Sequence, residues 1–149
     1  MSGHELTVPL LLEKGPDANV NRAVTGCPLH SAARIGFQRI VRLLLENGAL
    51  VNAKSELHGT TLSIATSLGY EEIVRLLLRI GVDVNVESGT NGTALRAAAG
   101  QRRIVIAKLL LENGADVNAK GARAVPGLQE ARRWSRVGML RLLLENGAQ

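Results

Sequence analysis

The residues best suited to chemistry are two adjacent carboxylates, a few histidines and a lone cysteine. Glu71 and Glu72 come nearest to a catalytic carboxylate pair, but they begin a predicted helix. Negative charge stabilises a helix N-terminus, so this position favours a solvent-exposed structural pair. Cys27 lies in an apolar context, where we expect an inert side chain. His58 has no second type of metal ligand near it in the sequence, so no metal site is predicted there.

Four common catalytic and nucleotide-binding motifs do not occur in the sequence. It contains no Gly-x-Gly-x-x-Gly, no phosphate loop ending in Gly-Lys-Ser/Thr, no His-Glu-x-x-His and no Gly-x-Ser-x-Gly. One cysteine and three histidines also make a structural zinc site unexpected. We therefore predict a protein that is not an enzyme, with no cofactor and no bound metal.

The elements that would position any site are repeated along the whole chain. Leu-Leu-Leu-Glu-Asn-Gly-Ala occurs three times, and two altered copies keep the leucines and the glycine. The first leucines of the five copies are evenly spaced, at Leu10, Leu43, Leu76, Leu109 and Leu142. A fixed period of this length is typical of a solenoid, whose small units stack because none can bury its own apolar face.

Each unit carries signals for two short helices and an extended finger. Thr60 and Thr93 are predicted N-caps of a first helix, and Pro28 suits the first helical position. A turn glycine such as Gly36 comes before the second helix, and the glycine after the leucine triplet ends that helix. Arg102 replaces the turn glycine in the third unit, so that turn either changes shape or carries strain.

The period divides the chain into a single domain over residues 1–149. A partial repeat at 1–21 comes before repeats at 22–54, 55–87, 88–120 and 121–149. In the last repeat, Val125-Pro126-Gly127 replaces the finger glycine and the N-cap, which weakens the signal for its first helix. Its leucine-rich end lacks a polar cap. We expect a monomer, with a longer array or end-to-end association as the alternatives.

Helix, turn, helix, glycine stop and finger, all within one period, together resemble the ankyrin repeat. Pro28-Leu29-His30-Ser31-Ala32 matches the Thr-Pro-Leu-His-x-Ala signature of that family, except that Cys27 takes the place of threonine. The resemblance covers nearly the whole chain. It implies an all-α solenoid of L-shaped helix-turn-helix units with β-turn fingers. It also implies that His30 hydrogen-bonds neighbouring backbone rather than a metal or a substrate.

Three asparagines recur after the glycine stop, at Asn52, Asn85 and Asn118. We expect each to hold its finger turn through hydrogen bonds from side chain to backbone. In the ankyrin family, asparagines at this place can also be substrates of an asparagine hydroxylase, so modification stays open as an alternative.

The resemblance implies that a protein partner binds a concave face formed by the fingers and the first helices. Contact residues are expected where the repeats differ, because scaffold positions recur. The predicted contacts are Glu56, Leu57, His58, Thr90, Asn91 and Arg123 in the fingers, and Arg34, Ile35, Leu68, Gln101, Arg133 and Trp134 on the first helices. Tryptophan and arginine are frequent binding hot spots. The alternative for Trp134 is that it closes the apolar end of the last repeat.

Charge is unevenly distributed along the chain. The net charge is +5, and residues 90–149 carry 10 Lys+Arg against 4 Asp+Glu. We expect this charge to form a solvated surface that keeps the protein soluble, with steering of an acidic partner as the alternative. Nucleic-acid binding is the second functional reading, but aromatic residues make up only 2% of the chain and cannot form a stacking platform. The predicted basic set is Arg96, Arg102, Arg103, Arg133 and Arg136.

The remaining sequence features bear on location. A single cysteine excludes an intrachain disulfide and suits a reducing compartment. We find no secretory leader, and basic residues interrupt the apolar runs before they reach membrane-spanning length. The expectation is a cytoplasmic protein without a membrane segment, with the nucleus as the alternative location. Its expected role is protein binding, alone or within a larger scaffold or receptor.

Overall fold

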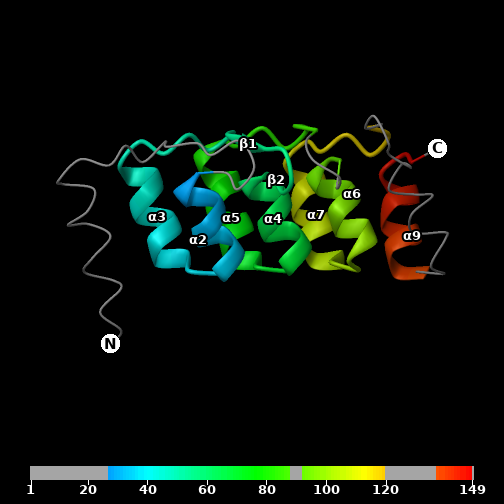
Figure 1. Ribbon diagram of the computed structural model, residues 1–149. Helices are drawn as coiled ribbons and strands as arrows, with labels where there is room; N and C mark the ends of the chain where they lie inside the picture. The colour runs from blue at the N-terminus through cyan, green and yellow to red at the C-terminus, as the bar shows by residue number, and fades with distance from the viewer. Residues whose placement is uncertain (1–26, 88–91, 120–136, 149) are drawn as a thin grey trace.

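The computed structural model is a row of paired helices with extended segments along one edge (Figure 1). It describes residues 27–87, 92–119 and 137–148. Helices of the same kind begin at equal intervals that match the sequence period, which confirms the predicted all-α solenoid. The first helices are α2 (Pro28–Ile35), α4 (Thr61–Leu68) and α6 (Ala94–Gly100), and the second helices are α3 (Gln38–Glu46), α5 (Glu71–Ile80), α7 (Ile104–Glu112) and α9 (Val137–Glu145).

Helices of each kind stack into their own row (Figure 1). Helix α4 packs between α2 and α6, and α5 packs between α3 and α7, which in turn contacts α9. The middle leucine of each triplet is buried between the rows, where it replaces the apolar contacts that a single short helix cannot make. These leucines are Leu44, Leu77, Leu110 and Leu143.

The first helices begin with the predicted caps. The Thr60 hydroxyl accepts a hydrogen bond from the Ser63 N–H at 3.1 Å, and the Thr93 hydroxyl accepts one from the Arg96 N–H at 3.3 Å. Each cap satisfies a backbone donor that has no partner inside the helix. Pro28, which has no N–H, is the first residue of α2.

Glycine suits position 36, in the turn between α2 and α3, for two reasons. Gly36 has φ of +81°, a conformation that residues with a Cβ rarely adopt. A Cβ at Gly36 would also lie 2.8 Å from the Tyr70 ring in the next repeat. The turn therefore sets the spacing between stacked repeats as well as the angle between the paired helices.

One finger is described from strand to strand. Strands β1 (Lys54–Ser55) and β2 (Gly59–Thr60) pair antiparallel, with Lys54 opposite Thr60 and Ser55 opposite Gly59. This confirms the predicted extended finger with a tight turn in that repeat. The fingers run along the edge of the array where the first helices begin (Figure 1). The partial repeat at 1–21, the finger tip at 88–91 and the segment 120–136 lie outside the described residues.

Arg102 keeps the turn geometry of the glycines that it replaces. Its φ is +61°, and among the described residues it is the one residue other than glycine with a positive φ. The left-handed conformation brings Cβ against the following carbonyl and costs about 1–2 kcal/mol. Of the two predicted outcomes, the structure has the strained one.

We expect Arg102→Gly to raise the free energy of unfolding by about 0.5–1 kcal/mol. Glycine removes the strain, although part of the gain is offset by the greater freedom of the unfolded chain. Denaturant unfolding followed by circular dichroism measures the change. Arg102→Ala is the control, because it removes the side chain but keeps Cβ. Equal stability of the glycine and alanine variants would show that the backbone conformation is not strained.

Candidate functional site

His30 is a structural residue, as the sequence predicted. Its imidazole is only 2% exposed. Nδ1 accepts a hydrogen bond from the Cys27 N–H at 3.0 Å, so the ring proton is assigned to Nε2, which lies 3.1 Å from the Ala53 carbonyl oxygen. His30 thus ties the start of α2 to the segment that leads into the finger, and both ring nitrogens are occupied by this task.

Cys27 is buried beside His30, with Sγ 3.1 Å from Nδ1. Burial raises the pKa of the Cys27 thiol, but its hydrogen bonds with His30 and with the backbone of Leu29 lower it by more, so the pKa lies below its ordinary value. A lowered pKa favours reactivity only where a substrate can reach the sulfur. The side chain is only 3% exposed, which agrees with the inert role predicted for it.

Glu71 and Glu72 belong to the surface of α5. They are its first two residues, where their negative charge faces the positive end of the helix. Arg75, one turn later, donates from Nε to Glu71 Oε1 at 3.1 Å. This is an ordinary surface ion pair. Within the described ranges, no three residues among His, Cys, Asp and Glu are grouped so that they could hold a metal ion.

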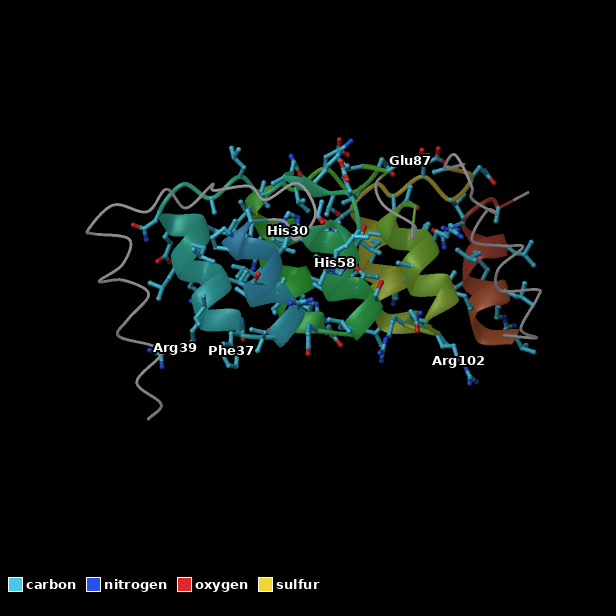
Figure 2. All side chains as sticks on the ribbon, viewed as in Figure 1. His30, Phe37, Arg39, His58, Glu87 and Arg102 are labelled. Carbon is cyan, nitrogen blue, oxygen red and sulfur yellow. The ribbon has the colours of Figure 1, made fainter. Side chains whose placement is uncertain are left out.

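The predicted contacts in the finger between β1 and β2 lie together at its tip. Glu56, Leu57 and His58, here called the finger group, connect β1 to β2. Leu57 is 55% exposed and His58 is partly exposed. The His58 N–H donates to the Ser55 hydroxyl at 3.4 Å, which helps to close the turn. Figure 2 shows His58 in front of the first helices.

The predicted contacts on the described first helices lie at the opposite end of those helices. We call Arg34, Ile35, Leu68 and Gln101 the turn group, because each is next to a turn between paired helices. All four are exposed. In Figure 2, Arg102 marks this end of the array, and the fingers mark the other end. The structure therefore divides the predicted site into two groups.

The middle of α4 does not connect these groups, because Thr61 through Thr66 are all buried. Sequence comparison between repeats did not reveal this. Ser63 and Thr66 look like ordinary surface residues by type, yet α4 is packed between α2 and α6 as well as against α5. Only the last two residues of α4 have substantial exposure.

Five of the predicted contacts lie outside the described residues. The sequence predicts that they belong to the later fingers and to a first helix in the last repeat. The two alternatives for Trp134, partner contact and closure of the apolar end, both remain predictions. The five residues are Thr90, Asn91, Arg123, Arg133 and Trp134.

The finger asparagines bond to backbone as predicted, but the backbone belongs to the next repeat. Asn85 Nδ2 donates to the Gly114 carbonyl at 3.0 Å, and its Oδ1 accepts from the Asp116 N–H at 2.7 Å. Asn52 accepts from the backbone of the following finger in the same way, and Asn118 donates to the Gly147 carbonyl of the last repeat. These residues therefore join neighbouring repeats rather than closing a single turn.

The predicted basic set requires a correction at Arg103. Its guanidinium covers the turn at Gly69 in the preceding repeat and donates to the Ser67 and Leu68 carbonyls at 3.4 and 3.2 Å. Carbonyl oxygens at the end of a helix attract a cation, so Arg103 is used for packing between repeats. Arg96 is also half-buried, which leaves Arg102 as the exposed arginine of the set among the described residues.

Two other basic residues of the C-terminal half have acidic neighbours. Lys108 lies 3.9 Å from Glu112, and Arg141 lies 3.4 Å from Glu145. Together with the position of Arg103, these pairs reduce the positive charge that the described surface offers to a nucleic acid. The reading as a nucleic-acid-binding protein gains no support from them.

The comparisons with known proteins agree with the repeat architecture. In the described parts of the chain, none of the helices has both the length and the apolar character needed to cross a bilayer. No curated protein matches the chain. A family model of ankyrin repeats in three copies matches residues 1–88 and again residues 62–149, so the two matches cover the whole sequence. Ankyrin repeats generally mediate protein–protein interactions. The chain belongs to the ankyrin-repeat family.

Proposed function

We propose that this chain is a non-catalytic protein-binding module whose partner contacts the finger group and the turn group. The observation that supports this proposal is the exposure of apolar side chains at positions that vary between repeats. Ile35 is 56% exposed and Leu68 is 43% exposed, and each ends a first helix whose scaffold leucine is fully covered. Covering such side chains with a partner is favourable because it removes apolar surface from water.

The polar neighbours of these side chains suit a binding surface. Arg34 is beside Ile35, Glu56 is beside Leu57, and Gln101 takes the place of Ile35 and Leu68 in the third repeat. An apolar centre with a polar rim is the usual composition of a protein interface. Since these positions are not needed for packing, they are free to specify the partner.

The distance between the two groups constrains the partner. A first helix of eight residues rises about 12 Å from the finger to the turn. A partner that contacts both groups must therefore span at least one helix length across the array. A folded domain or a long extended segment fits this requirement, whereas a small molecule does not.

The proposal is tested by affinity capture with the intact chain and with the triple variant Ile35→Ser, Leu57→Ser, Leu68→Ser. The matched control is Val105→Ser with Leu144→Ser, because these side chains are similarly exposed but belong to second helices. We expect the native chain and the control to retain the same protein, and the triple variant to bind it at least tenfold more weakly. Equal retention by the triple variant would contradict the proposed surface.

A further inference from the structure

The end of α5 departs from the other second helices in two adjacent residues. Three copies read Leu-Leu-Leu-Glu-Asn-Gly, whereas α5 reads Leu76-Leu77-Leu78-Arg79-Ile80-Gly81. In the other copies the asparagine side chain donates to the carbonyl four residues earlier, at 2.8 Å each time. Ile80 cannot make this bond, and it is 48% exposed. An apolar side chain thus replaces an asparagine whose side chain would donate a hydrogen bond to a backbone carbonyl at the helix end.

Arg79 also changes the charge pattern at the end of the helix. In α7 and α9 the glutamate at this place lies near a basic residue one turn earlier. In α5, Arg79 follows Arg75 by four residues, and like charges at that spacing are unfavourable. Arg75 pairs instead with Glu71 at the start of the helix. A cation in the last turn is favoured by the helix dipole, so the charge change by itself is not a cost to the helix. Ile80, however, loses a side-chain hydrogen bond and exposes apolar surface, which points to a role outside the helix.

Both residues line a groove between α3 and α5. The groove has a volume of about 470 Å³ and is lined by Arg42, Leu45, Glu46, Leu76, Arg79 and Ile80. Leu76 is buried and Leu45 is half-buried, so they form an apolar floor, with Ile80 exposed at one side. A neighbouring groove between α5 and α7, of about 390 Å³, also includes Arg79. These grooves belong to the row of second helices, away from the finger group.

The charges of the α3–α5 groove favour an acidic ligand. Two guanidiniums, of Arg42 and Arg79, and one carboxylate, of Glu46, line it. Within the described part of the chain, neither arginine has an ion-pair partner. A guanidinium binds a carboxylate through two parallel hydrogen bonds, and the apolar floor can accept a side chain between two such contacts.

We propose that the α3–α5 groove is a second docking site, which binds an acidic protein segment carrying an apolar side chain. Carboxylates of the segment pair with Arg42 and Arg79, and its apolar side chain packs on Leu76 and Ile80. This site is separate from the finger and turn groups. The chain therefore has two independent binding faces, one on each row of helices.

The test uses a fluorescein-labelled peptide in which pairs of glutamates alternate with pairs of leucines. A second peptide has glutamine in place of every glutamate. The variant Arg79→Glu, Ile80→Asn restores the sequence found in the other three copies, so it is expected to fold at least as stably as the native chain. We expect fluorescence anisotropy to show binding of the glutamate peptide to the native chain and at least tenfold weaker binding to this variant. The glutamine peptide is expected to bind the native chain at least tenfold more weakly as well.

Two controls distinguish this groove from the other surfaces of the chain. Arg102→Glu makes the same change in charge at a distant exposed arginine, and the triple serine variant alters the finger and turn groups. Both are expected to bind the glutamate peptide as the native chain does. Equal affinity of the peptide for the native chain and Arg79→Glu, Ile80→Asn would overturn the proposal. A native dimer that this variant converts to a monomer in sedimentation would also overturn it, since a second copy would then occupy the groove.

Discussion

Replacing His30 with alanine is expected to lower the free energy of unfolding by about 2–4 kcal/mol. The variant leaves the Cys27 N–H and the Ala53 carbonyl oxygen without the partners that the imidazole supplies. It also leaves a space beside residues that are buried in the native chain. The two bonded groups are far apart in the sequence, so the loss loosens the start of α2 and the base of the finger together. Denaturant unfolding followed by circular dichroism measures the change.

Ser31→Ala is the matched control for this prediction. Ser31 is the next residue on α2 and is exposed, so its replacement is expected to change stability by less than about 0.5 kcal/mol. A His30→Ala variant as stable as Ser31→Ala would show that the imidazole is not a structural link. In that case His30 would have to be reconsidered as a functional residue.

Replacing Asn85 with alanine is expected to lower the free energy of unfolding by about 1–2 kcal/mol. The variant removes both the bond to the Gly114 carbonyl and the bond from the Asp116 N–H. Both partners belong to the next repeat, so the loss weakens an interface between repeats rather than a repeat itself. In a solenoid, such interfaces determine whether the repeats unfold together. We expect a broader unfolding transition as well as a lower midpoint.

Asn113→Ala provides a control with the same residue type and a similar exposure. The Asn113 side chain donates to the Leu109 carbonyl in its own helix, at 2.8 Å, and joins no two repeats through that bond. Its replacement is expected to lower stability by less than half as much and to leave the width of the transition unchanged. If the two variants broadened the transition equally, the asparagines in the fingers would not be couplers between repeats.

Features that depend on local sequence were predictable. The Thr60 cap needs only a hydroxyl at the right spacing before the N–H whose bond it accepts, and this spacing is visible in the sequence. The turn at Gly36 needs only a residue that tolerates a positive φ. The fixed period then shows that such units must stack. Because Arg102 occupies the place of a turn glycine, the sequence predicted either a changed turn or a strained one, and the structure has the strained turn.

Contacts between side chains of one repeat and the backbone of another could not be predicted in this way. Arg103 looked like a free surface cation, but the Ser67 and Leu68 carbonyls that it meets belong to the preceding repeat. Asn85 has a side chain that could bond within its own turn, and only the three-dimensional stack brings Gly114 and Asp116 into reach. A polar residue type gives no indication of such distant partners.

The candidate partner-binding residues were likewise predictable only in part. Exposure of Ile35 and Leu57 agrees with the idea that variable positions are released from packing. That idea gave no indication that buried residues of α4 separate the finger group from the turn group. It also overlooked Arg79 and Ile80, because they lie on a second helix, where the family resemblance implies scaffold. The departure from Glu-Asn at those two positions was the signal in the sequence that could have identified them.

We propose that one protein partner contacts both the finger group and the turn group. The most direct measurement is photo-crosslinking from single positions, with a photoreactive amino acid placed at Leu57, at Leu68 or, as a control, at Val105. We expect the derivatives at Leu57 and Leu68 to form crosslinks to the same captured protein, and the derivative at Val105 to form none. Crosslinks from Val105 with none from Leu57 and Leu68 would contradict the claim and place binding on the second helices alone.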